Sequence, residues 1–334
     1  AEKDDSDTMR GRAAESSWKL WVLLDADRWL VTAGVLAGFF GVLVLISALA
    51  PVPLRTILGQ SDPTETLFQA LVTAIITGVT LVVTLNQLVL SQELGAVGDQ
   101  RERMDDAMQF RADVADVLDV EVSPSQPSGF LRALVLKAGE SARKLHEVVG
   151  ERDKGRETDV EAFAESVIEN ADNVAASLEN ERFGDFDVIS SALNFNYSWK
   201  LVTARQLLER HGESLDEQGR DALKDLIGVL ERFGPARAHF KTLYFQWALV
   251  DLSRHILVAA IPALLVSASM LLFVEIGAYS VVLFDVETLV IFVAGAVTVS
   301  LVPFFVLLAY IMRIATVAKH TLSIGPFILR DAGE

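Results

Sequence analysis

Four long apolar runs constrain the fold of this chain more than any other feature of its sequence. They extend from Trp29 to Ala50, from Leu67 to about Leu90, from Ile256 to about Ile276 and from Thr288 to about Ile311. A helix needs about 20 apolar residues to cross a hydrocarbon core of about 30 Å, and each run provides them. The sequence therefore predicts an all-α integral membrane protein with four transmembrane helices.

The positions of the basic residues predict how these helices are oriented. Lys and Arg occur before the first run, after the second, before the third and after the fourth, whereas the connections 51–66 and 275–287 contain a single basic residue, Arg55. Basic residues favour the cytoplasmic side of a membrane. We therefore expect both termini and the long central segment to lie in the cytoplasm of a multi-pass cell-membrane protein.

The predicted organisation has five parts, which follow from these spans. They are a cytoplasmic N-terminal lead with an interfacial helix (1–28), transmembrane helices one and two (29–94), an acidic helical cytoplasmic domain (95–250), transmembrane helices three and four (251–312) and a cytoplasmic C-terminal tail (313–334). The central domain is expected to be a helical bundle inserted between helices two and three, because its apolar residues recur every three or four positions.

Within the central domain, the same periodicity predicts helices at 129–149, 160–178, about 186–210 and 215–233. Proline and glycine predict breaks at 123–127, at 150–155 and at Gly234-Pro235. Pro235 suits the first turn of a helix that continues into the third apolar run, because proline is tolerated at that position.

Most of the charge lies in the central domain. The chain has 29 Lys and Arg against 45 Asp and Glu, a net charge of −16. Residues 96–250 contain 19 of the basic residues and 29 of the acidic residues. We interpret the acidic excess, with 20 Arg against 9 Lys, as surface hydration in a salt-rich cytoplasm. The aspartates between Asp105 and Asp119 have the same interpretation, because they lack the spacing and the glycine of a calcium loop.

The composition and motifs exclude several functions. The absence of cysteine rules out disulfides, thiolate metal sites and a cysteine nucleophile. A basic patch for nucleic acid is missing. Residues 150–156 have the glycine spacing of a phosphate loop without its lysine, and the five histidines are dispersed. We therefore expect neither an enzyme nor a bound metal or cofactor.

The second apolar run carries an uncharged polar stripe along its whole length. At about 100° per residue, its polar side chains fall within roughly 40° of the centre of one helix face. They are Thr66, Gln69, Thr73, Thr77, Thr80, Thr84, Gln87 and Ser91. The opposite face consists of Leu, Ile and Val. Because lipid does not solvate such a stripe, a membrane helix that carries it needs polar partners or water.

Two interpretations of the stripe compete. Several copies of the helix could surround an axis and line a water-filled pore with these side chains. Alternatively, the hydroxyls bond back to carbonyls of their own helix or across to the first span, where Gly34, Gly38 and Gly41 form a close-packing surface. A substrate cavity is a third option. The two glutamines favour the pore, because a long amide needs several hydrogen-bond partners.

Other residues have roles that depend on the pore. A set of acidic residues would surround its outer mouth and concentrate cations, although they also suit the loops of a salt-adapted protein. They are Asp62, Glu65, Glu275, Asp285 and Glu287. Gly95 and Gly98 are candidate hinges at the inner end of helix two, or mark a simple helix end. The spans contain no ionisable residue at midplane depth, which argues against ion-coupled transport.

Two stretches resemble uncharacterised four-span membrane proteins of halophilic archaea. They are Val83-Thr-Leu-Asn86-Gln87-Leu-Val-Leu-Ser91-Gln92-Glu93-Leu94 and the C-terminal Ser323-Ile324-Gly325-Pro326-Phe327. The resemblance implies an archaeal cell membrane and no established activity, so it assigns no functional residues.

The sequence thus leads to one functional hypothesis and one alternative. The hypothesis is a homo-oligomeric channel for inorganic ions, cations among them, that is lined by the stripe and gated or assembled by the cytoplasmic domain. An oligomer is required because four spans in one chain are too few to enclose a pore with one such stripe. The alternative is a non-conducting scaffold or sensor that recruits a cytoplasmic protein partner. Either protein would reside in the lipid bilayer and bind no nucleic acid.

Overall fold

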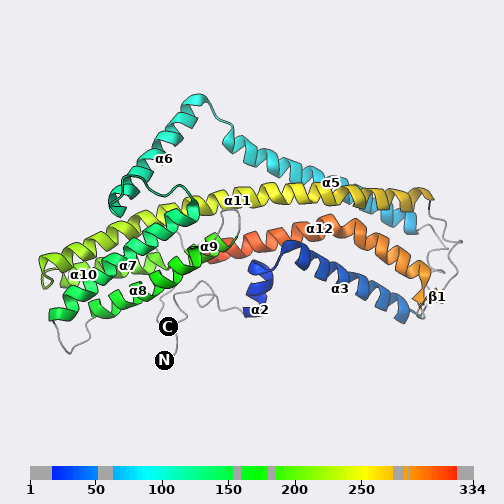
Figure 1. Cartoon of the computed structure of the whole chain (residues 1–334). Coiled ribbons are helices and arrows are strands. Elements are labelled where there is room, and N and C mark those ends of the chain that lie inside the picture. The colour runs from blue at the N-terminus through cyan, green and yellow to red at the C-terminus, as the bar shows by residue number, and fades with distance from the viewer. Residues whose placement is uncertain are drawn as a thin grey trace. The chain divides into compact units, whose positions relative to one another are not determined.

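The described part of the chain is almost entirely helical (Figure 1). The computed structural model describes residues 17–51, 63–152, 159–179, 186–273, 282–283 and 286–321. In chain order the helices are α2 (Ser17–Leu20), the π-helical turn η2 (Trp21–Asp25), α3 (Arg28–Leu49), α5 (Pro63–Glu93), α6 (Val97–Leu118), α7 (Pro127–Arg152), α8 (Asp159–Leu178), α9 (Phe186–Leu193), α10 (Tyr197–His211), α11 (Glu217–Phe273) and α12 (Thr288–Thr321). Between α11 and α12, strands β1 (Val282–Leu283) and β2 (Val286–Glu287) pair in antiparallel orientation.

Four helices in the described residues are long and apolar enough to cross a membrane: α3, α5, α11 and α12. They contain the second and fourth runs, the first run to Leu49 and the third to Phe273, so the prediction of a helical protein with four such helices is confirmed. The four helices suggest that the protein inserts into a membrane.

Residue contacts divide the chain into two compact units. One unit consists mainly of Gly95–Phe245, and the other consists of Trp21–Leu94 and Gln246–Thr316. Helix α11 contributes its first part to one unit and its last part to the other.

The predicted break at Gly234-Pro235 is wrong, because α11 continues through both residues. Gly234 is buried against Tyr197, and a Cβ at this position would lie 2.7 Å from the Cε2 atom of the tyrosine. The glycine therefore allows close packing of α10 on α11, and packing on both sides of Pro235 keeps the helix intact.

The single helix predicted over 186–210 is also wrong, because the chain turns between α9 and α10. At this turn Phe195 is completely buried and its ring packs against Phe233 of α11, with centroids 5.0 Å apart. Burying this aromatic ring favours the turn over helix continuity, which periodicity alone does not reveal.

The unit built on Gly95–Phe245 has one apolar core, to which α6 to α11 all contribute. The stripe predicted over 160–178 is the buried face of α8. Helix α7 packs along α8, where a Cβ on Gly139 would lie 3.1 Å from the Cβ of Ala171. At the surface, Arg143 of α7 forms an ion pair with Asp172 of α8, and Arg132 of α7 forms one with Glu179, the residue after α8.

In the other unit, α5, α11 and α12 pack together through three apolar clusters. One contains Phe68 of α5, Met270 of α11 and Leu289 of α12. The other two continue along the same helices around Ile75 and Val82 of α5. Ser267 of α11 and Ser300 of α12, both completely buried, form a hydrogen bond of 2.7 Å between the two helices.

Helix α3 is less enclosed than α12. In the most apolar 18-residue stretch of each helix, 6% of the residues of α3 are buried, against 50% of those of α12. Its first turn is nevertheless held firmly. The Asp27 carboxylate caps the helix by accepting hydrogen bonds from the amides of Trp29 (2.7 Å) and Leu30 (3.2 Å). Arg28 is 6% exposed and donates to carbonyls of residues 23, 24 and 26 before the helix and to that of Ala309 in α12.

Candidate functional site

The polar stripe of α5 lies on the face that points away from the core of its unit. All its side chains are exposed: Thr66, Gln69, Thr73, Thr77, Thr80, Thr84, Gln87 and Ser91. The buried residues of α5 include Phe68, Leu71, Ile75 and Val82, which pack on α11 and α12. At about 100° per residue these two sets lie on opposite sides of the helix. The described part of one chain therefore leaves the stripe uncovered.

Five of the six hydroxyl groups of the stripe donate to carbonyls of their own helix. Thr73, Thr77, Thr80 and Thr84 each bond the carbonyl four residues earlier, at 3.0, 2.8, 2.9 and 2.9 Å, and Ser91 bonds that of Leu88 at 2.7 Å. These bonds satisfy the hydroxyl hydrogens and leave the oxygen lone pairs available. The stripe consequently presents hydrogen-bond acceptors, which suit water and cations.

The glutamines of the stripe differ from the hydroxyl residues. Among the described residues, the side-chain amides of Gln69 and Gln87 have no hydrogen-bond partner, and both are exposed. Each amide carries two donors and an acceptor that its own helix does not satisfy. The glutamines therefore require water or polar groups from outside the described chain if the helix lies in lipid.

The first span does not cover the stripe within one chain. A Cβ added at Gly34, Gly38 or Gly41 would meet no atom of the described residues within 4 Å outside the local helix backbone, and these glycines are exposed. The packing of the stripe on the glycines of the same chain, which the second interpretation allows, is therefore absent from the described structure. Packing between two chains stays a prediction.

The other predicted site residues lie apart from the stripe or outside the described side chains. Glu65 is exposed in the first turn of α5, which adds a negative charge at that end. Asp62, Glu275 and Asp285 lie outside the described residues, and Glu287 is described only as part of β2. Gly95 lies in the short connection between α5 and α6, and Gly98 lies in the first turn of α6.

Sequence reasoning missed a polar junction of three helices in the same unit. The Nδ1 atom of His255 in α11 lies 2.8 Å from the hydroxyl of Tyr310 in α12, and the ring of Trp29 in α3 packs edge-on against the histidine at 5.5 Å. Arg313 of α12 donates to the carbonyl of Ala26, which also accepts from Arg28. These partners are distant in sequence, so no local pattern indicates the junction.

No curated protein and no solved structure matches the chain. A family model covers residues 1–334, and the chain therefore belongs to DUF7972, a family of unknown function.

Proposed function

We propose that this protein is a homo-oligomeric ion channel of the cell membrane in which the Thr/Gln face of α5 lines the conducting path. Both termini and residues 95–250 lie on the cytoplasmic side, and the helical unit there gates or assembles the channel. Glu65 at the outer end of α5 attracts cations toward the path.

The observation that carries the proposal is the outward position of an eight-residue polar stripe on an apolar helix. In a single chain the stripe would face lipid, where the two glutamine amides lack partners. Assembly around an axis removes this conflict, because the side chains then face water. If the stripe instead packs on other helices, water does not reach the glutamine amides. Their hydrogen bonds are then formed only if those helices present matching polar groups.

Cysteine accessibility tests the proposal on a clean background, since the natural chain has no cysteine. Single cysteines replace Thr73, Thr77, Thr80 and Thr84 in the stripe, and Leu81 and Leu90 serve as exposed α5 controls outside it. We expect a charged, membrane-impermeant thiol reagent to modify the stripe positions and to reduce ion flux through reconstituted protein. The control positions stay unmodified if they face lipid.

Conductance distinguishes a pore from packing. We expect Thr80→Leu to reduce single-channel conductance while the oligomer stays intact, and Leu81→Val to leave it unchanged. Wild-type protein that forms oligomers in liposomes of varied composition but passes no ions would contradict the channel. Lost assembly in Thr80→Leu with unreactive stripe cysteines would assign the stripe to packing between chains.

A second candidate function has its own supporting observation. In residues 97–108 of α6, Val97, Met104 and Met108 are 82%, 63% and 58% exposed, whereas the following part of the helix joins the apolar core. A non-conducting scaffold or sensor would use such a face to recruit a cytoplasmic protein. Substitution of both methionines by glutamine should then abolish partner binding and leave ion flux, if any, unaltered.

A further inference from the structure

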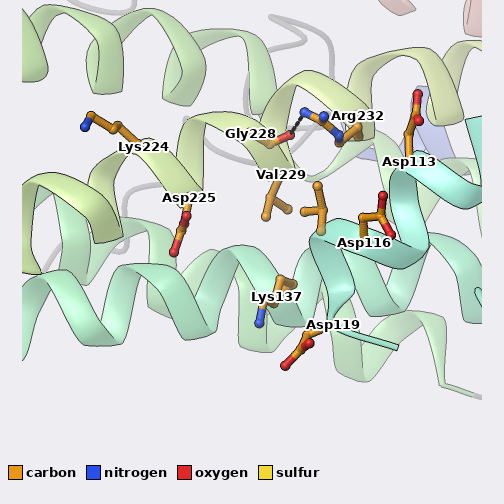
Figure 2. A pocket seen from close by; sticks show the side chains of 10 residues that line it. Asp113, Asp116, Asp119, Lys137, Lys224, Asp225, Gly228, Val229 and Arg232 are labelled. Carbon is orange, nitrogen blue, oxygen red and sulfur yellow. Dashed lines mark hydrogen bonds between the residues drawn. The ribbon is translucent and has the colours of Figure 1, made fainter. Parts of the chain in front are cut away.

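A cleft of about 540 Å³ in the unit built on Gly95–Phe245 is separate from the stripe of α5 (Figure 2). Figure 2 shows charged side chains that reach it from the C-terminal end of α6, from α7 and from α11. Its volume lies within the range of about 300–1,000 Å³ that is typical of small-molecule sites.

Apolar packing fixes the walls of the cleft. Val114 of α6 is completely buried in the core of the unit, and the ring of Phe110 packs against Phe130 of α7 with centroids 6.2 Å apart. Arg111 donates to the carbonyl of Ser123 at 2.8 Å and ties α6 to the following loop. These contacts involve none of the charged side chains that line the cleft.

The charges that face the cavity do not neutralise each other directly. The carboxylates of Asp116 and Asp119 form no ion pair among the described residues. On the opposite walls, Lys137 pairs with Glu140 at 3.2 Å and Lys224 pairs with Asp221 at 3.4 Å. Arg232 forms no ion pair among the described residues and donates from Nη1 to the carbonyl of Gly228 at 3.1 Å. Both signs of charge are therefore available to a molecule in the cleft.

A hydrogen bond within α11 fixes the position of the arginine. The guanidinium of Arg232 lies back along the helix, where its Nη1 atom donates to the carbonyl of Gly228 at 3.1 Å. The bond to the carbonyl orients the planar group in advance, which favours recognition of a carboxylate.

The arrangement of the carboxylates determines the class of ligand. They are spread over α6 and α11, and the described residues contain no cluster of three or more His, Asp or Glu that could hold a metal ion. Asp113, Asp116, Asp119 and Asp225 outnumber the cationic Lys137, Lys224 and Arg232. A complementary ligand is thus an extended molecule with cationic groups in excess over one anionic group.

We propose that this cleft binds a small organic zwitterion with a net positive charge, of the basic amino acid class. Its carboxylate faces Arg232, and its ammonium and side-chain cation face Asp116, Asp119 and Asp225. The proposal is independent of whether α5 conducts ions.

Calorimetric titration of the full chain in detergent at low ionic strength tests the proposal, with free arginine as the probe. We expect saturable binding of one arginine per chain. Agmatine, which lacks the carboxylate, and citrulline, which lacks the side-chain charge, should each bind at least about tenfold more weakly, since each loses a charge-assisted contact. Equal binding of agmatine and arginine would mean that the cleft attracts cations without recognising a carboxylate. Absence of saturable heat would overturn the proposal.

Two variants with the same change in charge locate the site. Asp116→Asn with Asp119→Asn removes two cleft carboxylates, and asparagine tolerates the left-handed backbone of residue 119 (φ 57°). Asp105→Asn with Asp106→Asn removes two exposed carboxylates of α6 that do not line the cleft. We expect about tenfold weaker arginine binding in the first variant and wild-type binding in the second. Equally weakened arginine binding in both variants would mean that arginine binds to the acidic surface in general, and would contradict binding in the cleft.

Discussion

Arg28 shows how a charged residue can be accommodated at the start of an apolar helix. Its Nη1 atom donates to the carbonyls of Leu23 (3.1 Å) and Ala309 (3.5 Å), and its Nη2 atom donates to those of Leu24 (3.1 Å) and Ala26 (2.7 Å). The guanidinium thereby satisfies carbonyls at the end of η2 and fixes the start of α3 against α12. A lysine has the same charge but cannot reproduce this planar set of bonds.

We therefore expect Arg28→Lys to lower the free energy of unfolding by about 2–3 kcal/mol, because buried carbonyls lose charged donors. Thermal unfolding in detergent, followed by circular dichroism, measures the loss. The exposed Arg254 provides the control, and Arg254→Lys should leave the transition within about 0.5 kcal/mol of wild type. Equal stability of the two variants would refute the structural role of Arg28.

The ion pairs of Glu140 on α7 predict how the stability of the fold depends on pH. Its carboxylate lies 2.8 Å from Nζ of Lys144 and 3.2 Å from that of Lys137. The hydrogen bond from Lys144, helped by Lys137 and opposed by partial burial, holds the pKa of Glu140 below its ordinary value. A lowered pKa means that the carboxylate stabilises the fold above the unfolded pKa of about 4.3, and that this stability is lost as pH falls through the folded pKa.

Glu140→Gln should accordingly reduce the free energy of unfolding by about 0.3–0.5 kcal/mol at neutral pH, a small value because solvent screens exposed pairs. Well below the folded pKa, the variant and the wild type should be equally stable. Urea unfolding at both pH values measures the difference, and Glu147→Gln on the same helix is the matched control. A difference that persists in acid would contradict the ion-pair explanation.

At the scale of helices, α3 offers a test of assembly. Its glycines Gly34, Gly38 and Gly41 lie on a face that the described part of the chain leaves open. We expect Gly38→Leu to preserve folding of a single chain, since a new side chain meets open space. If this face contacts a neighbouring chain, the leucine blocks close approach and weakens the oligomer.

Sedimentation or single-molecule photobleaching of Gly38→Leu in detergent and in lipid measures the number of chains. Gly38→Ala is the control, because it adds helix propensity with little bulk. Unchanged assembly in Gly38→Leu would remove the glycine face from the interface and leave the stripe of α5 as the remaining candidate.

The helices could be predicted from the sequence where periodicity or apolar length determines them. The four apolar runs and the buried face of α8 are of this kind, and so is the alignment of Thr73, Thr77 and Thr80 on one face of α5. The turn at Phe195 and the intact helix at Pro235 could not be predicted, because tertiary packing on Phe233 and Tyr197 decides both. The cleft was inaccessible to sequence reasoning, since its walls come from three helices that are distant in the chain.

At the scale of the whole molecule, the apolar core of the unit built on Gly95–Phe245 lies within that range of residues. We expect a fragment of residues 95–245 to fold on its own into a helical domain with a cooperative thermal transition. Its acidic excess predicts that the midpoint rises when potassium chloride is increased from about 0.1 to 1 M, because the screening length falls from about 10 to 3 Å.

Circular dichroism and differential scanning calorimetry of the fragment test both statements. A fragment with helical signal but no cooperative transition would mean that the core needs the rest of the chain. A midpoint that falls with salt would mean that attractive ion pairs such as that of Arg143 with Asp172 outweigh the repulsion between carboxylates.

The chemistry of the α5 stripe has a consequence for the conditions under which the protein would work. Threonine hydroxyl and glutamine amide groups stay uncharged at any pH that a cell experiences. A conducting path lined by Thr and Gln would therefore keep the same charge in acid and in alkali. Such a path offers a membrane steady permeability in surroundings whose acidity varies.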